Sequence, residues 1–171
     1  QTVVEITPGG GWYTEILAPY LKDGGRYVGA IIDPSKQANE RSRDYYAKSN
    51  EGLRTLLAGA PEAYGRAELV EFDIAAPVLG PAGSADLVLT FRNVHNWVAA
   101  GTTDAYFQAF FAALKPGGVL GVVDHRARPG TDLDTMKKSG YLTEALVIDH
   151  ATRAGFVLDA RSEVNANPKD S

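Results

Sequence analysis

The stretch TVVEITPGGG, residues 2–11, shows how the chain begins to fold. Thr2–Ile6 is rich in β-branched residues, which favour a strand, and Pro8 with the three glycines after it favours a turn. Apolar residues then recur on one face over about residues 13–21, which predicts a helix. A strand, a glycine-rich turn and a helix in this order are typical of α/β proteins.

The rest of the chain continues the alternation of strands and helices. Further strands are predicted at Tyr27–Ile32, Glu68–Phe72, Ala85–Phe91, Val119–Asp124 and Phe156–Ala160, and helices at about 103–114, at about 143–154 and after a capping Ser35. We therefore expect an α/β fold with a doubly wound, mostly parallel sheet. With 171 residues and no convincing linker, residues 1–171 are predicted to form a single domain.

Composition narrows the classes of function. Apolar residues make up 44% and charged residues 22%, as in globular proteins. The net charge of −4 argues against nucleic acid as a partner, because that affinity depends on Lys and Arg. There is no cysteine, so disulfides and thiolate metal sites are excluded. No apolar run approaches the roughly 20 residues of a membrane span.

Three strand ends carry residues that suit a nucleoside ligand. The glycines before the first helix allow close approach to backbone N–H groups. Asp33 stands at the end of the second strand, 22 positions after Gly11, where an acid accepts hydrogen bonds from ribose hydroxyls. Asp73 ends the third strand and could accept one from an adenine amino group. Glycine clusters also occur in plain turns and strand-end Asp residues also serve as caps, so the joint order and spacing carry this interpretation.

Longer stretches resemble a known family. VVEITPGGGWYTEIL (residues 3–17) is similar to the first motif of class I S-adenosylmethionine (SAM)-dependent methyltransferases, and SADLVLTFRNVHNW (84–97) with FFAALKPGGVLGVVDH (110–125) is similar to their fourth and fifth strands. WYTEILAPYL, VDHRA, SGYLTEALVI and SEVNANPKD further resemble a bacterial group of methyltransferases identified from sequence. The resemblance covers nearly the whole chain and implies SAM as cofactor.

The resemblance also implies which residues bind SAM. Residues expected around the methionine part and the sugar edge are Glu5, Thr7, Gly9 and Gly11. The others are Asp33 for the ribose, Asp73 and Ile74 for the adenine, and Phe91, Arg92 and Asn93 on the sulfonium side. Thr7 departs from the family, whose acid-x-Gly-x-Gly pattern has glycine there, and the departure falls in the part of the loop expected to contact methionine.

A dinucleotide-binding Rossmann protein is the competing interpretation of the glycine loop. Its G-x-G-x-x-G pattern would need a third glycine at position 14, which is Thr14, and Trp12 and Tyr13 would crowd a pyrophosphate. SAM has no pyrophosphate and suits the loop better than NAD. A SAM- or S-adenosylhomocysteine-binding protein without transfer activity is a further alternative.

Two histidines are candidates for a catalytic base. His95 follows the fourth strand and His125 follows the fifth, whereas His150 lies in the last helix. We expect His125 to be the better base, with Asp124 orienting its ring. Both histidines can equally be ordinary residues at the rim of the sheet. No metal site is predicted, because the spacing of Asn93, Asp124, His125 and Asp149 is not diagnostic of one.

The expected activity is methyl transfer to a small-molecule acceptor, at an O, N or C atom, in the cytoplasm. Class I methyltransferases have seven strands, and only six are predicted here, so the sheet is expected to lack its seventh strand. The chain begins at Gln1 without Met, and the family continues beyond residue 171. We therefore expect the natural protein to be longer at both ends, with an exported form left open.

Overall fold

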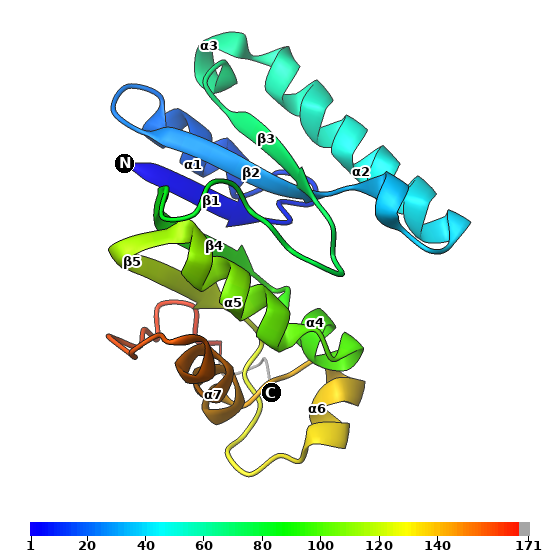
Figure 1. Ribbon diagram of the computed structural model, residues 1–171, viewed down its shortest axis with the longest axis vertical. Coiled ribbons are helices and arrows are strands. Elements are labelled where there is room, and N and C mark those ends of the chain that lie inside the picture. Colours follow the sequence, from blue (N-terminus) through cyan, green and yellow to red (C-terminus); the bar gives the residue numbers. More distant parts are fainter. Residues whose placement is uncertain (168–171) are drawn as a thin grey trace. The chain divides into compact units, whose positions relative to one another are not determined.

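The computed structural model describes residues 1–167 (Figure 1). The last four residues of the predicted domain, 168–171, lie outside the described part. Within residues 1–167 the strands are β1 (Thr2–Ile6), β2 (Arg26–Ile32), β3 (Glu68–Phe72), β4 (Ala85–Phe91) and β5 (Leu114–Val123). The helices are α1 (Thr14–Leu21), the 3-10 helix η1 (Pro34–Lys36), α2 (Glu40–Gly59), α3 (Pro61–Tyr64), α4 (Val94–Ala100), α5 (Thr103–Ala113), α6 (Leu133–Ser139) and α7 (Glu144–Ala154).

The strands form one sheet in the order β3-β2-β1-β4-β5. β1 pairs in parallel with both β2 and β4, and β2 pairs in parallel with β3. This is the predicted fold class, a parallel sheet flanked by helices. The strand order reverses between β1 and β4, and ligands of such sheets bind outside the carboxyl ends of the strands at that reversal. β1 ends at Ile6, so the glycine-rich loop begins at this point.

The chain divides into two compact units, which are described separately. The first comprises residues 1–90 and 112–121, and the described part of the second comprises residues 91–111 and 122–167. In the first unit, a core of Val3, Ala18, Leu21 and Tyr27 joins β1, α1 and β2. Burying a side chain such as Leu21 contributes roughly 1.5–3 kcal/mol.

The second unit has an aromatic core built from α4 and α5. Trp97 stacks on Tyr106 with ring centroids 4.1 Å apart, and Phe110 packs against both rings. Trp97 is only 6% exposed, so its ring belongs to the core of this unit. Gly101, Gly140 and Gly155 end α4, α6 and α7 with positive φ angles, a conformation that glycine adopts without a Cβ penalty.

Two predicted elements differ in the structure. Ser35 does not cap the polar helix: it lies in η1, and the side chain of Asn39 accepts the N–H of Ser42 at the start of α2. β5 begins at Leu114, earlier than predicted, because α5 ends at Ala113 and the chain passes directly into the strand. The carbonyls of Ala112 and Ala113 accept the N–H groups of Gly83 and Ser84 at that junction.

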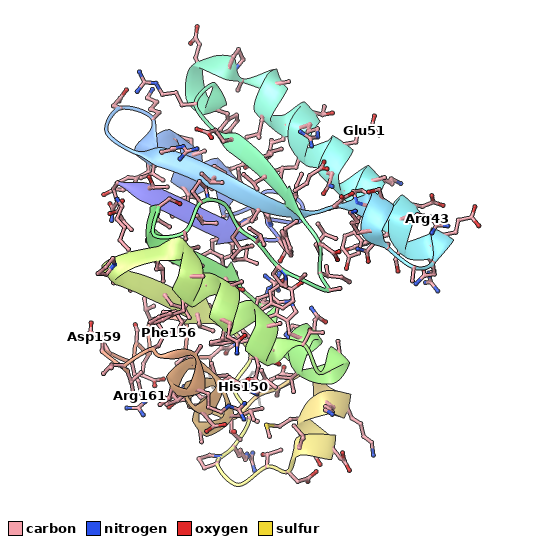
Figure 2. All side chains as sticks on the ribbon, viewed as in Figure 1. Arg43, Glu51, His150, Phe156, Asp159 and Arg161 are labelled. Carbon is pink, nitrogen blue, oxygen red and sulfur yellow. The ribbon has the colours of Figure 1, made fainter. Side chains whose placement is uncertain are left out.

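The predicted sixth strand, Phe156–Ala160, is wrong. This segment has neither strand nor helix structure, and it follows α7 as an irregular stretch in which Figure 2 labels Phe156, Asp159 and Arg161. Phe156 packs edge-on against Phe111, but Val157 is 90% exposed. A strand needs a hydrogen-bonded neighbour, and the apolar alternation of this segment could not supply one.

Candidate functional site

Glu5 is a buried carboxylate next to the carboxyl end of β1. Glu5 is 1% exposed, and its Oε2 accepts hydrogen bonds from the hydroxyls of Tyr27 at 2.6 Å and Thr14 at 3.0 Å. The two hydroxyl oxygens are themselves 2.7 Å apart. Burial raises the pKa of Glu5, and the hydrogen bonds from Tyr27 and Thr14 oppose the rise. Burial and the charge of Glu5 also raise the pKa of Tyr27.

The register of the sheet explains how Tyr27 reaches Glu5. Glu5 lies opposite Gly29 of β2, and Tyr27 precedes Gly29 by two residues, on the same face of the strand. A Cβ at position 29 would lie 3.3 Å from the Tyr27 hydroxyl oxygen and 2.8 Å from Leu69. The missing side chain at Gly29 therefore makes room for the hydroxyl. Thr14 and Tyr27 are not among the predicted site residues. The pairing of β1 with β2 is the signal that could have revealed Tyr27, whereas Thr14 lies on α1 and gives no such signal.

Thr7 follows Glu5 and Ile6 in a strained conformation. Its φ is 47°, in the left-handed region that a β-branched residue rarely adopts. Its hydroxyl oxygen is buried and has no hydrogen-bond partner among the described residues. Backbone strain and an unsatisfied buried hydroxyl both cost free energy, and such features cluster at functional sites.

Gly9 and Gly11, which follow Thr7, differ in what surrounds them. Gly9 has a φ of 60°, and a Cβ built there meets no atom within 4 Å, so the loop is open on that side. Gly11 has a φ of 87°, and a Cβ there would lie 2.5 Å from Leu56 and 3.1 Å from Leu53. Gly11 thus lets α2 pack against the loop, while Gly9 leaves space above the backbone. Trp12, directly after Gly11, is 66% exposed and packs edge-to-face on Tyr13.

The two acids at strand ends also form local turns. Oδ1 of Asp33 accepts the backbone N–H and the hydroxyl of Ser35, which lowers the pKa of Asp33. Oδ1 of Asp73 accepts the N–H of Ala75. Asp33 therefore caps η1, whereas Asp73 closes a turn, and in both the side-chain hydrogen bonds fall on Oδ1. Ile74 follows Asp73 and is half-buried. These acids belong to the first unit, as do Glu5, Thr7, Gly9 and Gly11.

Phe91, Arg92 and Asn93 lie in the second unit, at the end of β4 and the start of α4. Arg92 has a φ of 57°, so it and Thr7 are the two non-glycine residues with positive φ in the described chain. Its N–H donates to the carbonyl of Val123. Their part in SAM binding stays a prediction.

Asp124, at the end of β5, orients a different histidine from the one predicted. Oδ1 lies 2.9 Å from Nδ1 of His95, and Oδ2 accepts the backbone N–H of His95. Toward His125, Asp124 accepts the backbone N–H rather than contacting the ring. The expectation that Asp124 orients the His125 ring is therefore wrong, because the first turn of α4 brings His95 to the carboxylate. The His125 ring packs at 5.0 Å from Tyr141.

His150 is separate from this pair of histidines in its contacts. His150 lies on α7 (Figure 2). Its Nδ1 lies 2.6 Å from Oδ1 of Asp104, and Arg153 contacts both. Within residues 1–167 no group of three or more His, Asp or Glu side chains is placed to hold a metal ion. No helix in the same range is both long and apolar enough to cross a membrane.

Comparisons with known proteins identify the fold. No family model matches the chain, and no curated protein matches it. Among solved structures, a SAM-dependent methyltransferase from Methanosarcina mazei is similar with a TM-score of 0.69 and 16% identity, over 93% of this chain and 81% of that one. One from Aquifex aeolicus has a TM-score of 0.63 and 14% identity, over 93% and 73%.

The same fold also carries other chemistry. The cyclase SpnF is similar to this chain with a TM-score of 0.60 and 16% identity, over 92% of this chain and 53% of that one. At such identities the likeness shows the fold alone, and the activity has to be argued from the residues of this chain.

Proposed function

We propose that this chain is a SAM-dependent methyltransferase that acts on a small-molecule acceptor. The observation that carries the proposal is the loop after β1. It combines a strained Thr7, whose buried hydroxyl lacks a partner within residues 1–167, with an open space above Gly9, next to the buried Glu5. An unpaired donor beside exposed backbone is what a polar ligand would satisfy.

The residues of the first unit fit SAM. Thr7 and the backbone around Gly9 and Gly11 would hold the methionine part, with Glu5 below them. Asp33 would bind the ribose through its second oxygen, and Asp73 with Ile74 would meet the adenine. Three acids and no basic side chain in this set favour a ligand without phosphates over a dinucleotide. Position 14, where the dinucleotide pattern requires glycine, also favours SAM, because Thr14 is fully buried and hydrogen-bonded to Glu5.

When bound, SAM supplies a methyl group on a positively charged sulfur, which keeps the bonding electron pair on transfer, while the acceptor gains the methyl and loses a proton. The chain's own residues orient the reactants and hold that proton. His95 and His125 are the candidates for this task. The acidic net charge supports a small-molecule acceptor rather than nucleic acid.

Calorimetric titration with S-adenosylhomocysteine, and separately with NAD, tests the cofactor. Micromolar binding of S-adenosylhomocysteine alone is expected. Binding of NAD alone would replace the proposal with a dinucleotide-binding function. Binding of S-adenosylhomocysteine without turnover of SAM, across a broad acceptor panel, would favour a non-catalytic binding protein or another reaction on this fold, as the similarity to a cyclase illustrates.

A further inference from the structure

Asp124 accepts hydrogen bonds from two backbone N–H groups, whose orientation is fixed by the main chain. Its side chain is 5% exposed. Oδ1 accepts the backbone N–H of His125 at 2.8 Å, and Oδ2 accepts that of His95 at 3.1 Å. A backbone N–H can only donate, so both oxygens of Asp124 are fixed as acceptors. Three donors thus converge on this side chain, two from the backbone and one from the His95 ring.

This arrangement decides the tautomer of the His95 ring. Nδ1 lies 2.9 Å from the acceptor Oδ1, so Nδ1 must carry the hydrogen and donate it. In the neutral ring the lone pair then lies on Nε2. Within residues 1–167, no hydrogen bond of the protein occupies Nε2, and the side chain is 24% exposed. Other titratable groups near this ring are His125, with ring centroids 6.3 Å apart, and Tyr141 beyond it.

We propose that His95 is the base that takes the acceptor's proton at Nε2, that Asp124 is the positioning residue that fixes its tautomer, and that the acceptor group is a hydroxyl. The inference rests on the proposed function. In the transfer, the hydroxyl oxygen forms the new bond to carbon and the sulfur keeps the electron pair of the broken bond. The hydroxyl proton moves to Nε2 and then to water. The resulting imidazolium is stabilised by the adjacent carboxylate.

The hydroxyl follows from what such a base is needed for. A phenol-like hydroxyl keeps its proton at neutral pH, with a reference value of about 10, whereas a thiol near 8.5 already ionises in part. A general base typically contributes roughly 10²–10⁴-fold to the rate, and the benefit is greatest when the acceptor does not ionise by itself. The His95 imidazole, with its hydrogen fixed on Nδ1 and the lone pair of Nε2 accessible, can accept that proton.

The tautomer can be measured directly, without an acceptor. The chain has three histidines, so a long-range ¹H–¹⁵N spectrum of histidine-labelled protein is simple, and His95→Gln assigns one set of signals by its loss. At neutral pH, His95 is expected to show a protonated Nδ1 and an unprotonated Nε2. Asp124→Asn should abolish this pattern. A protonated Nε2 in the unmodified protein would overturn the inference.

A matched control uses the other Asp–His pair. Asp104→Asn removes the carboxylate next to His150 and should leave the His95 signals unchanged. If Asp104→Asn altered the His95 tautomer as Asp124→Asn does, the specific role of Asp124 would be refuted. Titration with S-adenosylhomocysteine on the same samples separates the two proposals. Lost binding with the expected tautomer would reject the proposed function, whereas retained binding with the opposite tautomer would reject only the base.

Discussion

Two carboxylates near strand ends, Glu5 near the end of β1 and Asp124 directly after β5, both have buried side chains but differ in their hydrogen-bond donors. Glu5 accepts from two side-chain hydroxyls, and both bonds fall on Oε2. Asp124 accepts from two backbone N–H groups and one imidazole, with bonds on both oxygens. The donors to Glu5 are side chains, which a mutation can remove, whereas two of the three donors to Asp124 are backbone N–H groups, which a side-chain mutation leaves in place. Glu5 therefore depends on its neighbours, while Asp124 is fixed by the main chain and can orient a reactive ring.

Removing one side-chain partner from each carboxylate gives the largest expected effect on stability. Tyr27→Phe leaves the buried carboxyl group of Glu5 with one donor fewer and should lower the free energy of unfolding by about 1–3 kcal/mol. His95→Ala leaves both backbone donors on Asp124 and should cost less than about 1 kcal/mol. Urea unfolding of the two variants measures the difference, with Tyr45→Phe on the surface of α2 as a control. Equal losses would contradict the comparison.

The second-largest expected effect is a loss of affinity for S-adenosylhomocysteine when Asp33 is replaced. Asp33→Ala removes the acceptor for the ribose and should weaken binding at least about tenfold, as loss of a charged hydrogen bond does. Asp132 is a matched control, because it caps α6 through the N–H and hydroxyl of Thr135 as Asp33 caps η1 through Ser35. Asp132→Ala should leave the affinity unchanged in the same titration. If both variants bound equally well, Asp33 would be a cap and nothing more.

A smaller effect of opposite sign is expected at Thr7. Thr7→Gly relieves a left-handed conformation that costs roughly 1–2 kcal/mol, although glycine loses about 0.5–1 kcal/mol in chain entropy. The fold should gain about 0.5–1 kcal/mol in thermal or urea unfolding, while affinity for S-adenosylhomocysteine decreases. Thr7→Val keeps the strain and loses only the hydroxyl, so it should weaken binding without stabilising the fold. Unchanged binding in both variants would remove Thr7 from the site.

The smallest expected effect is a pH dependence of the free energy of unfolding that comes from Glu5. Burial raises the pKa of Glu5 above its ordinary value of 4.5, so the folded protein keeps this proton where the unfolded chain releases it. Its contribution to stability is therefore present at low pH and is lost as the pH rises from about 4.5 through the folded value. Relative to Glu5→Gln, the free energy of unfolding should decline over that window and then level off. A rise over the same window would show that the hydroxyl donors outweigh burial.

The sequence predicted most of the sheet and little of the polar geometry. Thr2–Ile6 and Ala85–Phe91 were predicted with their observed bounds, because runs of apolar and β-branched residues between turn residues mark strands locally. Phe156–Ala160 has a similar local pattern but no neighbour to pair with. The contact between His95 and Asp124 joins residues 29 positions apart. Neither feature is visible in a local pattern.

The cofactor residues were predicted as a set of strand ends, and the structure confirms where those strands end. It could not be foreseen that Tyr27 reaches Glu5, because that contact depends on the space left at Gly29 in the neighbouring strand. The expectation that Asp124 orients the ring of His125 was wrong for a related reason. Adjacency in sequence suggested that Asp124 serves His125, whereas the first turn of α4 places His95 against the carboxylate.

The positions of the two tryptophans give the chain a pair of built-in optical reporters. Trp12, beside the glycine loop, is largely in water, whereas Trp97 is enclosed by Tyr106 and Phe110. Iodide should therefore quench the red-shifted emission of Trp12 and spare the blue-shifted emission of Trp97. In Trp97→Phe, the remaining fluorescence would come from the loop alone, so that a ligand settling over Gly9 could be followed as a change in colour and in quenching, without any label.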